Sequence, residues 1–129
     1  MPTVESILLK KGSDVIAVSA NTTVRKAVDK MIEANVGCVL VEKDGKAVGI
    51  FTERDLLRRV VGDDKGLDNT PIGEVMSSPV QSCQPGDDID ACFDQLNTSS
   101  FRHLAVLDRD EPVGVISLRD VALVLRENS

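Results

Sequence analysis

The amino-acid sequence repeats itself once along its length. Gly49 and Gly114 are 65 positions apart (114 minus 49), and Asp55 and Asp120 keep the same offset (120 minus 55). Two copies of one supersecondary unit therefore make up the chain, and a single copy would leave one sheet face exposed. Apolar positions match at this offset without a gap, although identities are few; the pairs include Val15 with Val80, Val24 with Ile89, Met31 with Leu96, Val41 with Val106 and Val48 with Val113.

Both copies predict the same element order, β-α-β-β-α. In each copy a short extended run leads through a polar cap to a helix with apolar residues on one face. Two strands follow, and the turn Lys43-Asp44-Gly45 between the first pair is a strong hairpin signal. A closing helix completes each copy. The predicted extended runs are 14–18 and 79–83, the paired strands are 37–42 with 46–52 and 103–108 with 112–117, and the closing helices are 53–61 and 118–126.

Residues 62–76 separate the two copies. Gly, Asp and Pro are frequent in this stretch, which predicts a linker followed by one helical turn at 71–76; its counterpart near the start of the chain is 4–9. The predicted domains are 1–66, the first repeat with its amino-terminal helical turn, and 67–129, the second repeat. We expect an α+β fold in which the two repeats pack sheet against sheet about a pseudo-two-fold axis.

Composition narrows the classes of function. With 15 Lys and Arg against 21 Asp and Glu the net charge is −6, and no basic cluster is large enough for general binding of nucleic acid. No apolar run approaches the length of a membrane span, and the amino terminus lacks the pattern of a signal peptide. The cysteines Cys38, Cys83 and Cys92 form no C-x-x-C motif, so we expect small buried residues in a reducing compartment. These features predict a cytoplasmic protein without a nucleic-acid or membrane partner.

The ends of the two copies carry a family resemblance. Each copy closes with Gly, two apolar residues, Ser or Thr, two further residues and Asp, as GIFTERD at 49–55 and GVISLRD at 114–120. EVMSSPV at 74–80 and FRHLAVLD at 101–108 add to the pattern. Together these motifs resemble a tandem pair of CBS domains, known as a Bateman module, over essentially the whole chain. One such motif would be weak evidence, whereas two in the same register are strong.

The resemblance implies a regulatory module without catalytic activity. Members of the family commonly bind adenosine-containing ligands in clefts between the two repeats, and stand-alone pairs commonly form disc-like homodimers. We accordingly expect AMP, ADP or ATP as a regulatory ligand, with NAD(H) or S-adenosylmethionine as alternatives. The homodimer would signal energy or redox state to a partner protein. A structural or dimerisation module with vestigial clefts stays open as a second interpretation.

Thr52 and Ser117 each end a strand and begin a helix, and two interpretations of these positions compete. As N-caps they would accept a backbone N–H bond worth about 1 kcal/mol, and the acid three residues later fits a capping box. Asp is shorter than the Glu or Gln preferred there, however, and a helix start also attracts phosphate. By the resemblance, Asp55 and Asp120 would accept hydrogen bonds from ribose hydroxyls. Both interpretations can hold at once.

The resemblance also implies which residues line the two clefts. Each cleft combines strand starts of one repeat with the final helix of the other, and apolar residues there would sandwich adenine or, equally, belong to the core. The first repeat has no basic pair at the start of its second strand, so the two clefts are expected to differ. One predicted set is Ser13, Ile16, Val36 and Gly37 with Ser117, Arg119 and Asp120; the other is Ser78, Gln81, Phe101, Arg102 and His103 with Thr52, Arg54 and Asp55.

The basic residues in these sets also have plainer interpretations. Arg54 and Arg119 fall on a first helical turn, where a cation opposes the helix dipole, so each is either a solvated side chain or a ligand contact. Arg102 and His103 would face a phosphate by the resemblance, or lie at the sheet rim. His103 is the only histidine, so a paired-His metal site or a catalytic triad has no second member. With neither a nucleophile elbow nor a P-loop present, we expect no enzymatic activity and no metal.

Overall fold

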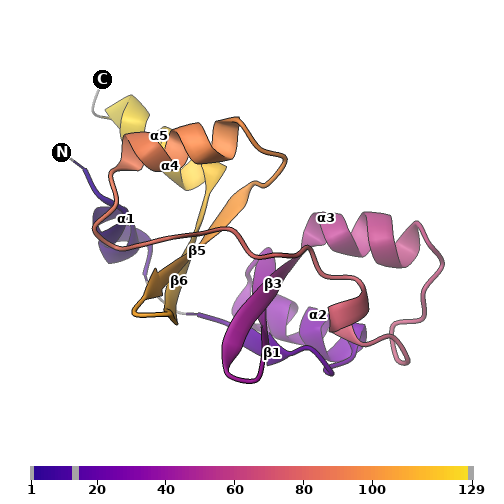
Figure 1. Cartoon of the computed structure of the whole chain (residues 1–129). Helices are drawn as coiled ribbons and strands as arrows, with labels where there is room; N and C mark the ends of the chain where they lie inside the picture. Colours follow the sequence, from indigo (N-terminus) through magenta and orange to yellow (C-terminus); the bar gives the residue numbers. More distant parts are fainter. Residues whose placement is uncertain (1, 13–14, 128–129) are drawn as a thin grey trace. The chain divides into compact units, whose positions relative to one another are not determined.

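The chain folds into two compact units of the same design. The computed structural model describes residues 2–12 and 15–127, and Figure 1 shows their helices and strands. Unit 2 is Ile16–Val80, and unit 1 combines the described residues of Met1–Val15 with those of Gln81–Ser129. Each unit is a three-stranded mixed sheet with helices. The predicted α+β fold of two repeats is therefore confirmed.

Unit 2 is built on a sheet with the strand order β1-β2-β3. β1 runs parallel to β2, and β2 runs antiparallel to β3. The predicted closing helix is present as a first helical turn, α3, that continues as a π-helix, η1. The elements are β1 (Ala17–Ser19), α2 (Val24–Ala34), β2 (Cys38–Lys43), β3 (Lys46–Thr52), α3 (Glu53–Asp55), η1 (Leu56–Val61) and the 3-10 helix η2 (Ile72–Glu74).

Unit 1 repeats this arrangement with the strand order β4-β5-β6 and the same parallel and antiparallel pairing. Its closing helix is a regular α-helix. A further helix from the start of the chain, α1, packs on it. The elements are α1 (Val4–Lys11), β4 (Ser82–Cys83), α4 (Ile89–Asn97), β5 (His103–Asp108), β6 (Glu111–Ser117) and α5 (Leu118–Glu127).

The helical segment that precedes each repeat in the sequence is hydrogen-bonded to the other repeat. The backbone N–H of Val4 donates to the carbonyl of Asp87 at 3.0 Å, so the start of α1 is bonded to the second repeat. Likewise the N–H of Ile72 donates to the carbonyl of Thr22 at 2.7 Å, which bonds η2 to the first repeat. The boundary between residues 66 and 67 stays a prediction for the repeats in the sequence. The compact units differ from it because each repeat buries apolar residues of the helical segment ahead of the other.

The two hairpins use the same turn with different residues. Asp44 and Gly45 have φ angles of 54° and 79°, and Arg109 and Asp110 have φ angles of 53° and 68°. Positive φ at both central residues defines a type I′ turn, whose twist matches the flanking strands. The first turn uses a glycine at its second position, and the second turn holds two residues with side chains in the left-handed region. The turn signal at 43–45 was correct, and its counterpart forms the same turn without glycine.

Helix α2 shows how the sequence sets the ends of these helices. The Thr23 side chain accepts a hydrogen bond from the backbone N–H of Lys26, and Asn35 ends the helix with a left-handed φ of 55°. Val24, Ala27 and Met31 lie on one face and are buried against the sheet. A short polar cap, a helical apolar period and a residue that tolerates positive φ therefore define the element.

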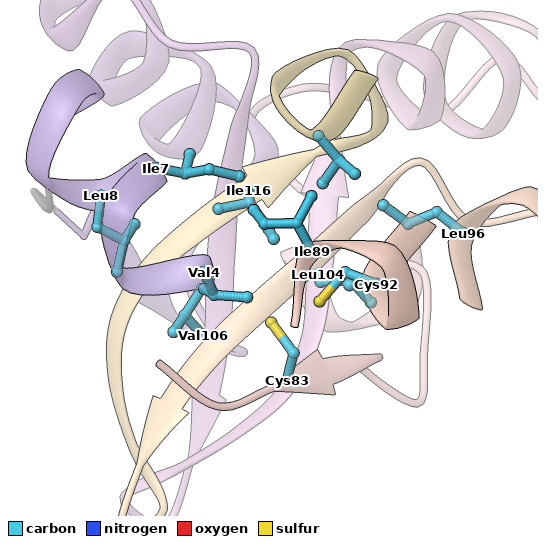
Figure 2. Close-up of a cluster of buried hydrophobic side chains, with 11 residues drawn as sticks. Val4, Ile7, Leu8, Cys83, Ile89, Cys92, Leu96, Leu104, Val106 and Ile116 are labelled. Atoms are coloured by element: carbon cyan, nitrogen blue, oxygen red, sulfur yellow. The ribbon is translucent and has the colours of Figure 1, made fainter. Parts of the chain in front are cut away.

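Each unit has its own aliphatic core, and Figure 2 shows that of unit 1. Figure 2 also shows that α1 contributes Val4, Ile7 and Leu8 to this cluster. In the region that the structure describes, no helix is long and apolar enough to cross a membrane. The core of unit 2 consists of Val18, Val24, Ala27, Met31, Val39, Val41, Phe51, Val60, Ile72 and Val75.

The first strand of each repeat is shorter than predicted. The run 14–18 gives β1 at Ala17–Ser19, and the run 79–83 gives only Ser82–Cys83. Both are edge strands that pair with a single neighbour, so few backbone hydrogen bonds extend them. The helical turn predicted at 71–76 is the 3-10 helix Ile72–Glu74, whereas its counterpart at 4–9 is the full helix Val4–Lys11.

Candidate functional site

The candidate site residues of unit 2 gather at one end of its sheet. Cys38, which begins β2, is the register partner of Thr52, which ends β3, because the two strands are antiparallel. The carbonyl of Gly37 accepts a hydrogen bond from the N–H of Glu53 at 3.1 Å. Val36 and Gly37 therefore lie beside the start of α3, and their predicted grouping with Ser117, Arg119 and Asp120 stays a prediction.

Thr52 begins α3 through a complete capping box. Its side-chain oxygen accepts a hydrogen bond from the backbone N–H of Asp55 at 3.2 Å, and its own N–H donates to Asp55 Oδ2 at 3.0 Å. The Thr52 hydroxyl also lies 3.2 Å from Asp55 Oδ2. The cap that the sequence predicted is present, with Asp in the place of the usual Glu.

The other oxygen of Asp55 is also engaged. Ser77 donates its hydroxyl hydrogen to Asp55 Oδ1 at 2.9 Å, and Arg59 Nε lies 3.7 Å from the same atom. Arg59 further donates to the carbonyl of Met76 at 2.7 Å. The Asp55 side chain is only 7% exposed. This carboxylate therefore joins the start of the closing helix to the segment Met76–Ser77.

Ser117 and Asp120 form the corresponding helix start in unit 1. The N–H of Ser117 donates to Asp120 Oδ2 at 2.8 Å, and the Ser117 hydroxyl accepts from the N–H of Asp120 at 3.1 Å. Here the additional partner is a cation: Lys11 Nζ lies 2.7 Å from Asp120 Oδ2 and also donates to the carbonyl of Val115 at 3.0 Å. The side chain of Asp120 is 22% exposed. Lys11 and the Ser117 N–H thus bind the same oxygen, Oδ2.

The ionisation of Asp120 reflects two opposing influences. Burial, the largest single influence, raises the pKa of its carboxyl group, whereas the hydrogen bond from Lys11 and the bonds from Ser117 lower it. The net effect lowers the pKa below its usual value of 3.8. Asp120 is therefore a carboxylate at neutral pH, with one oxygen held by Lys11 and Ser117.

The start of β5 lies beside this helix start of unit 1, and we call the two together the Asp120 corner. His103 is the register partner of Ser117, and the carbonyl of Arg102 accepts a hydrogen bond from the N–H of Leu118 at 2.9 Å. The Arg102 guanidinium donates to the carbonyls of Ser99 and Phe101 at 3.4 and 3.3 Å. Phe101, Arg102 and His103 thus lie beside the Ser117 helix start of their own repeat.

The remaining predicted residues have varied positions. Ile16 packs against the core of unit 2 and its carbonyl accepts from Leu40, so it has the core role that the sequence also allowed. The carbonyl of Gln81 accepts from Ala105 at 2.9 Å beside β4. Arg54, Ser78 and Arg119 are exposed. Ser13 lies outside the described residues. The predicted completion of each cleft by the other repeat stays a prediction.

Three residues that hold the two carboxylates were missed by sequence reasoning: Ser77, Arg59 and Lys11. Ser77 lies within the motif at 74–80, but only its neighbour Ser78 was selected. Arg59 follows Asp55 by four positions, the spacing of a helical ion pair, and this spacing could have identified it. Lys11 precedes Asp120 by more than a hundred residues, so no local pattern indicates the pair.

Two other features of the described residues bear on a site. A shallow surface hollow of about 450 Å³ is lined by residues 17–21 and 42–45. It lies at the hairpin end of β2, away from Thr52. Among residues 2–12 and 15–127, no group of three His, Cys, Asp or Glu side chains could hold a metal ion.

Comparison with known proteins supports the same repeat pattern. The sequence profile of the CBS domain matches residues 4–62 and again residues 72–127. The chain belongs to the CBS domain family. CBS domain-containing protein YhcV of Bacillus subtilis is 31% identical over 112 residues, which cover 86% of this chain and 79% of that protein. A solved CBS-domain protein from Burkholderia ambifaria MC40-6 is 31% identical with a TM-score of 0.89, and the alignment covers 99% of this chain and 96% of that one.

Two further CBS structures share the fold and contain ligands. A CBS domain protein from Pyrobaculum aerophilum, solved with AMP, has a TM-score of 0.82 and is 22% identical, with 98% of this chain and 99% of that chain covered. The CBS domain pair of protein MJ0100, solved with 5′-methylthioadenosine and S-adenosyl-L-methionine, has a TM-score of 0.84 and is 20% identical, with 100% and 99% covered. At these identities the comparison establishes the fold alone.

Proposed function

We propose that this CBS domain pair is a non-catalytic regulatory module that binds an adenosine-containing ligand and signals its concentration to a partner protein. The observation that carries the proposal is that both repeats present the same capped helix start, with a carboxylate at its third position. The carboxylates of Asp55 and Asp120 are suited to accept hydrogen bonds from the two hydroxyls of a ribose. AMP, ADP or ATP is the proposed ligand, and NAD(H) and S-adenosylmethionine are the alternatives.

Of the two helix starts, the Asp120 corner is better suited to bind a nucleotide than the helix start with Asp55. The Lys11 ammonium and the Ser117 N–H both bind Oδ2, and we assign Oδ1 to a ribose hydroxyl. Arg119 and Arg102 belong to the same corner and supply positive charge for a phosphate. The first N–H groups of α5, a helix of 10 residues, add the positive end of the helix dipole. This corner therefore suits an anionic nucleotide.

The Asp55 corner is closed in comparison. Both oxygens of Asp55 are engaged and its side chain is almost fully buried. A ribose hydroxyl would have to replace the Ser77 hydroxyl, which costs a hydrogen bond before it forms a new one. We therefore expect the first ligand to bind at the Asp120 corner.

Ligands of structural relatives agree in chemical class. The Pyrobaculum protein contains AMP, and the MJ0100 domain pair contains two adenosine derivatives that carry sulfur. All three molecules share an adenosine moiety with ribose hydroxyls. The proposal for this chain takes that shared moiety as its core and adds the phosphate because Arg102, Arg119 and Lys11 make the corner cationic.

Calorimetric titration of the full chain with AMP, ATP, NADH and S-adenosylmethionine tests the proposal. We expect sub-millimolar binding of at least one adenine nucleotide, and Asp120→Asn should weaken it about tenfold or more, because a hydrogen bond to a charged group contributes about 1.5–3 kcal/mol. Asp94→Asn, an exposed change on α4, is the matched control and should bind like the wild type. Absence of binding for all four compounds at sub-millimolar concentration would refute the proposal.

A structural or dimerisation module is the second candidate. The engaged, buried carboxylate of Asp55 favours it, because such a group is also what a purely structural cap would contain. This alternative expects Asp55→Asn and Asp120→Asn to change stability without changing affinity for any adenosine compound. The proposed homodimer applies to both candidates, and sedimentation equilibrium of the full chain measures it directly.

A further inference from the structure

Two of the three cysteines face one another in the core of unit 1. Cys83 lies on the edge strand β4 and Cys92 on helix α4, and they are only 6% and 2% exposed. Figure 2 shows their sulfur atoms pointing toward one another, among the aliphatic side chains of the cluster. The sequence predicted buried cysteines and gave no reason to pair these two.

The two thiols interact chemically as well as sterically. A hydrogen bond from the Cys83 side chain lowers the pKa of Cys92, although burial and the carboxylates of Asp87 and Asp88 oppose this. The same hydrogen bond, together with burial, raises the pKa of Cys83. Cys92 is therefore the thiol that ionises first, and Cys83 is the neighbour placed to react with it.

The other repeat shows that this pair is not required by the fold. At the offset of 65 positions Cys83 corresponds to Val18 and Cys92 to Ala27. Val18 and Ala27 are 5% and 0% exposed and belong to the core of unit 2. The same two positions are thus occupied there by ordinary apolar core side chains. The thiol pair is a property of unit 1 alone.

We propose that Cys83 and Cys92 are an oxidisable pair that a peroxide converts into a disulfide between β4 and α4. The Cys92 thiolate attacks one oxygen of hydrogen peroxide and becomes a sulfenic acid, with hydroxide as the leaving group. The Cys83 sulfur then attacks the sulfenic sulfur, its proton goes to the departing oxygen, and water leaves as the S–S bond forms. In total two thiols lose two hydrogens and one peroxide becomes two waters.

Local opening of the edge strand β4 would let peroxide reach these buried sulfurs. β4 has only two residues, Ser82 and Cys83, and lies at the edge of its sheet with β5 as its sole partner. Short edge segments open locally more readily than central strands. Oxidation would join this edge strand to α4 and restrict that opening. The inference does not depend on the proposed nucleotide site.

Peptide mapping of the full chain after peroxide treatment under native conditions tests the pair. Trypsin leaves Cys83 and Cys92 together on the fragment 66–102, which contains no internal Lys or Arg, and Cys38 on the fragment 31–43. We expect the fragment 66–102 to lose the mass of two hydrogens, to resist alkylation by iodoacetamide and to revert with dithiothreitol. If both cysteines remain alkylated, or if they cross-link only in urea, the proposal is wrong. A link between 66–102 and 31–43 would equally contradict it.

A double variant supplies the matched control. Cys83→Val with Cys92→Ala copies the residues of the first repeat, so it should fold with an unchanged far-UV spectrum. The urea midpoint of the wild type should rise after peroxide and return with dithiothreitol, because a cross-link restricts the unfolded chain. The midpoint of the double variant should not rise. An equal rise in both proteins would overturn the assignment, and the peptide map decides the matter if the variant fails to fold.

Discussion

The helix starts at Thr52 and Ser117 come from the same pattern in the two repeats, yet their carboxylates are held in different ways. Asp55 is buried and shares its two oxygens among Thr52, Ser77 and Arg59. Asp120 is more exposed, and Lys11 binds its Oδ2, the same oxygen that accepts the hydrogen bond from the Ser117 N–H. The difference shows that one local motif supports two tasks. In unit 2 it fastens the segment Met76–Ser77 ahead of β4, and in unit 1 it binds a lysine of α1.

Removing each carboxylate in turn tests this difference most directly. We expect Asp55→Ala to lower the free energy of unfolding by about 2–3 kcal/mol, because it removes a buried carboxylate that binds Thr52 and Ser77. Asp120→Ala should cost about 1 kcal/mol, the usual value of a helix-capping interaction. Urea unfolding followed by circular dichroism measures both. Asp63→Ala, an exposed change beyond η1, is the control, and equal losses at 55 and 120 would contradict the distinction.

The equivalent glycines on β3 and β6 test how rigidly each segment is held. A methyl group on Gly49 would lie 2.8 Å from the backbone oxygen of Ser77, whereas one on Gly114 would meet the side chain of Leu8 at 2.6 Å. Backbone held by Asp55 yields less readily than a leucine side chain. We expect Gly49→Ala to cost about 2 kcal/mol and Gly114→Ala about 1 kcal/mol, within the range for overpacked cores.

Thermal unfolding of the two glycine variants gives this order directly. The companion variants Gly49→Ser and Gly114→Ser should fall in the same order, since their Cβ atoms meet the same neighbours. A larger loss at Gly114 than at Gly49 would show that α1 is held more rigidly than the segment Met76–Ser77.

The pH dependence of stability tests the Lys11–Asp120 pair. Because the pKa of Asp120 is lowered in the folded state, its contribution is present above the unfolded pKa and is lost as the pH falls through the folded pKa. Lys11→Met should cost about 0.5–1 kcal/mol at neutral pH, the range for a partly exposed pair, and almost nothing at pH values below the folded pKa. Urea unfolding from neutral to acid pH measures the difference.

Lys10→Met is the matched control for that measurement. Lys10 pairs with Glu127, and both side chains are more than half exposed. This variant should show little change in stability at any pH. A pH-independent loss for Lys11→Met would mean that the lysine acts through packing of its aliphatic stem rather than through the charge of Asp120.

The smallest expected effect is at the hairpin of unit 1. Asp110 holds a φ of 68° where the other hairpin has Gly45 at 79°. Asp110→Gly should stabilise the protein by about 0.5 kcal/mol, because glycine relieves the left-handed strain but loses more entropy on folding. The reverse change, Gly45→Asp, should destabilise by a similar amount. Thermal midpoints measure both, and a loss of stability in Asp110→Gly would show that the aspartate side chain itself supports the turn.

Most of the fold could be predicted from the repeat and from local chemistry. The helix starts at Thr23 and Thr52 and the turn at Asp44-Gly45 follow from residue types that act within a few positions of one another. β3 and β5 have the predicted bounds for the same reason: their apolar runs are closed by turn residues and caps. The shorter β1 and β4 depend on how far an edge strand pairs with its neighbour, and periodicity does not contain that information.

The candidate site was predicted only in part, and its composition shows why. Thr52, Asp55, Ser117 and Asp120 were identified because each pair lies within one turn of helix. The predicted grouping of Val36 with Ser117, Arg119 and Asp120 of the other repeat stays a prediction. The residues that decide how open each carboxylate is come from elsewhere in the chain, and so they were not identified.

By itself, the sequence determined that this chain is a duplication, that each copy is β-α-β-β-α, and that each closes on a capped helix with an aspartate at its third position. These properties depend on neighbours along the chain, and hydrogen bonds and steric limits over three or four residues suffice to define them. Only the tertiary structure decided that α1 packs on the second repeat, that Lys11 holds Asp120 while Ser77 holds Asp55, and that Cys83 faces Cys92. Those contacts join segments that are distant in the sequence. They form because the chain adopts the arrangement that buries the apolar surface of both cores, and this arrangement also brings the charged groups and the thiols together.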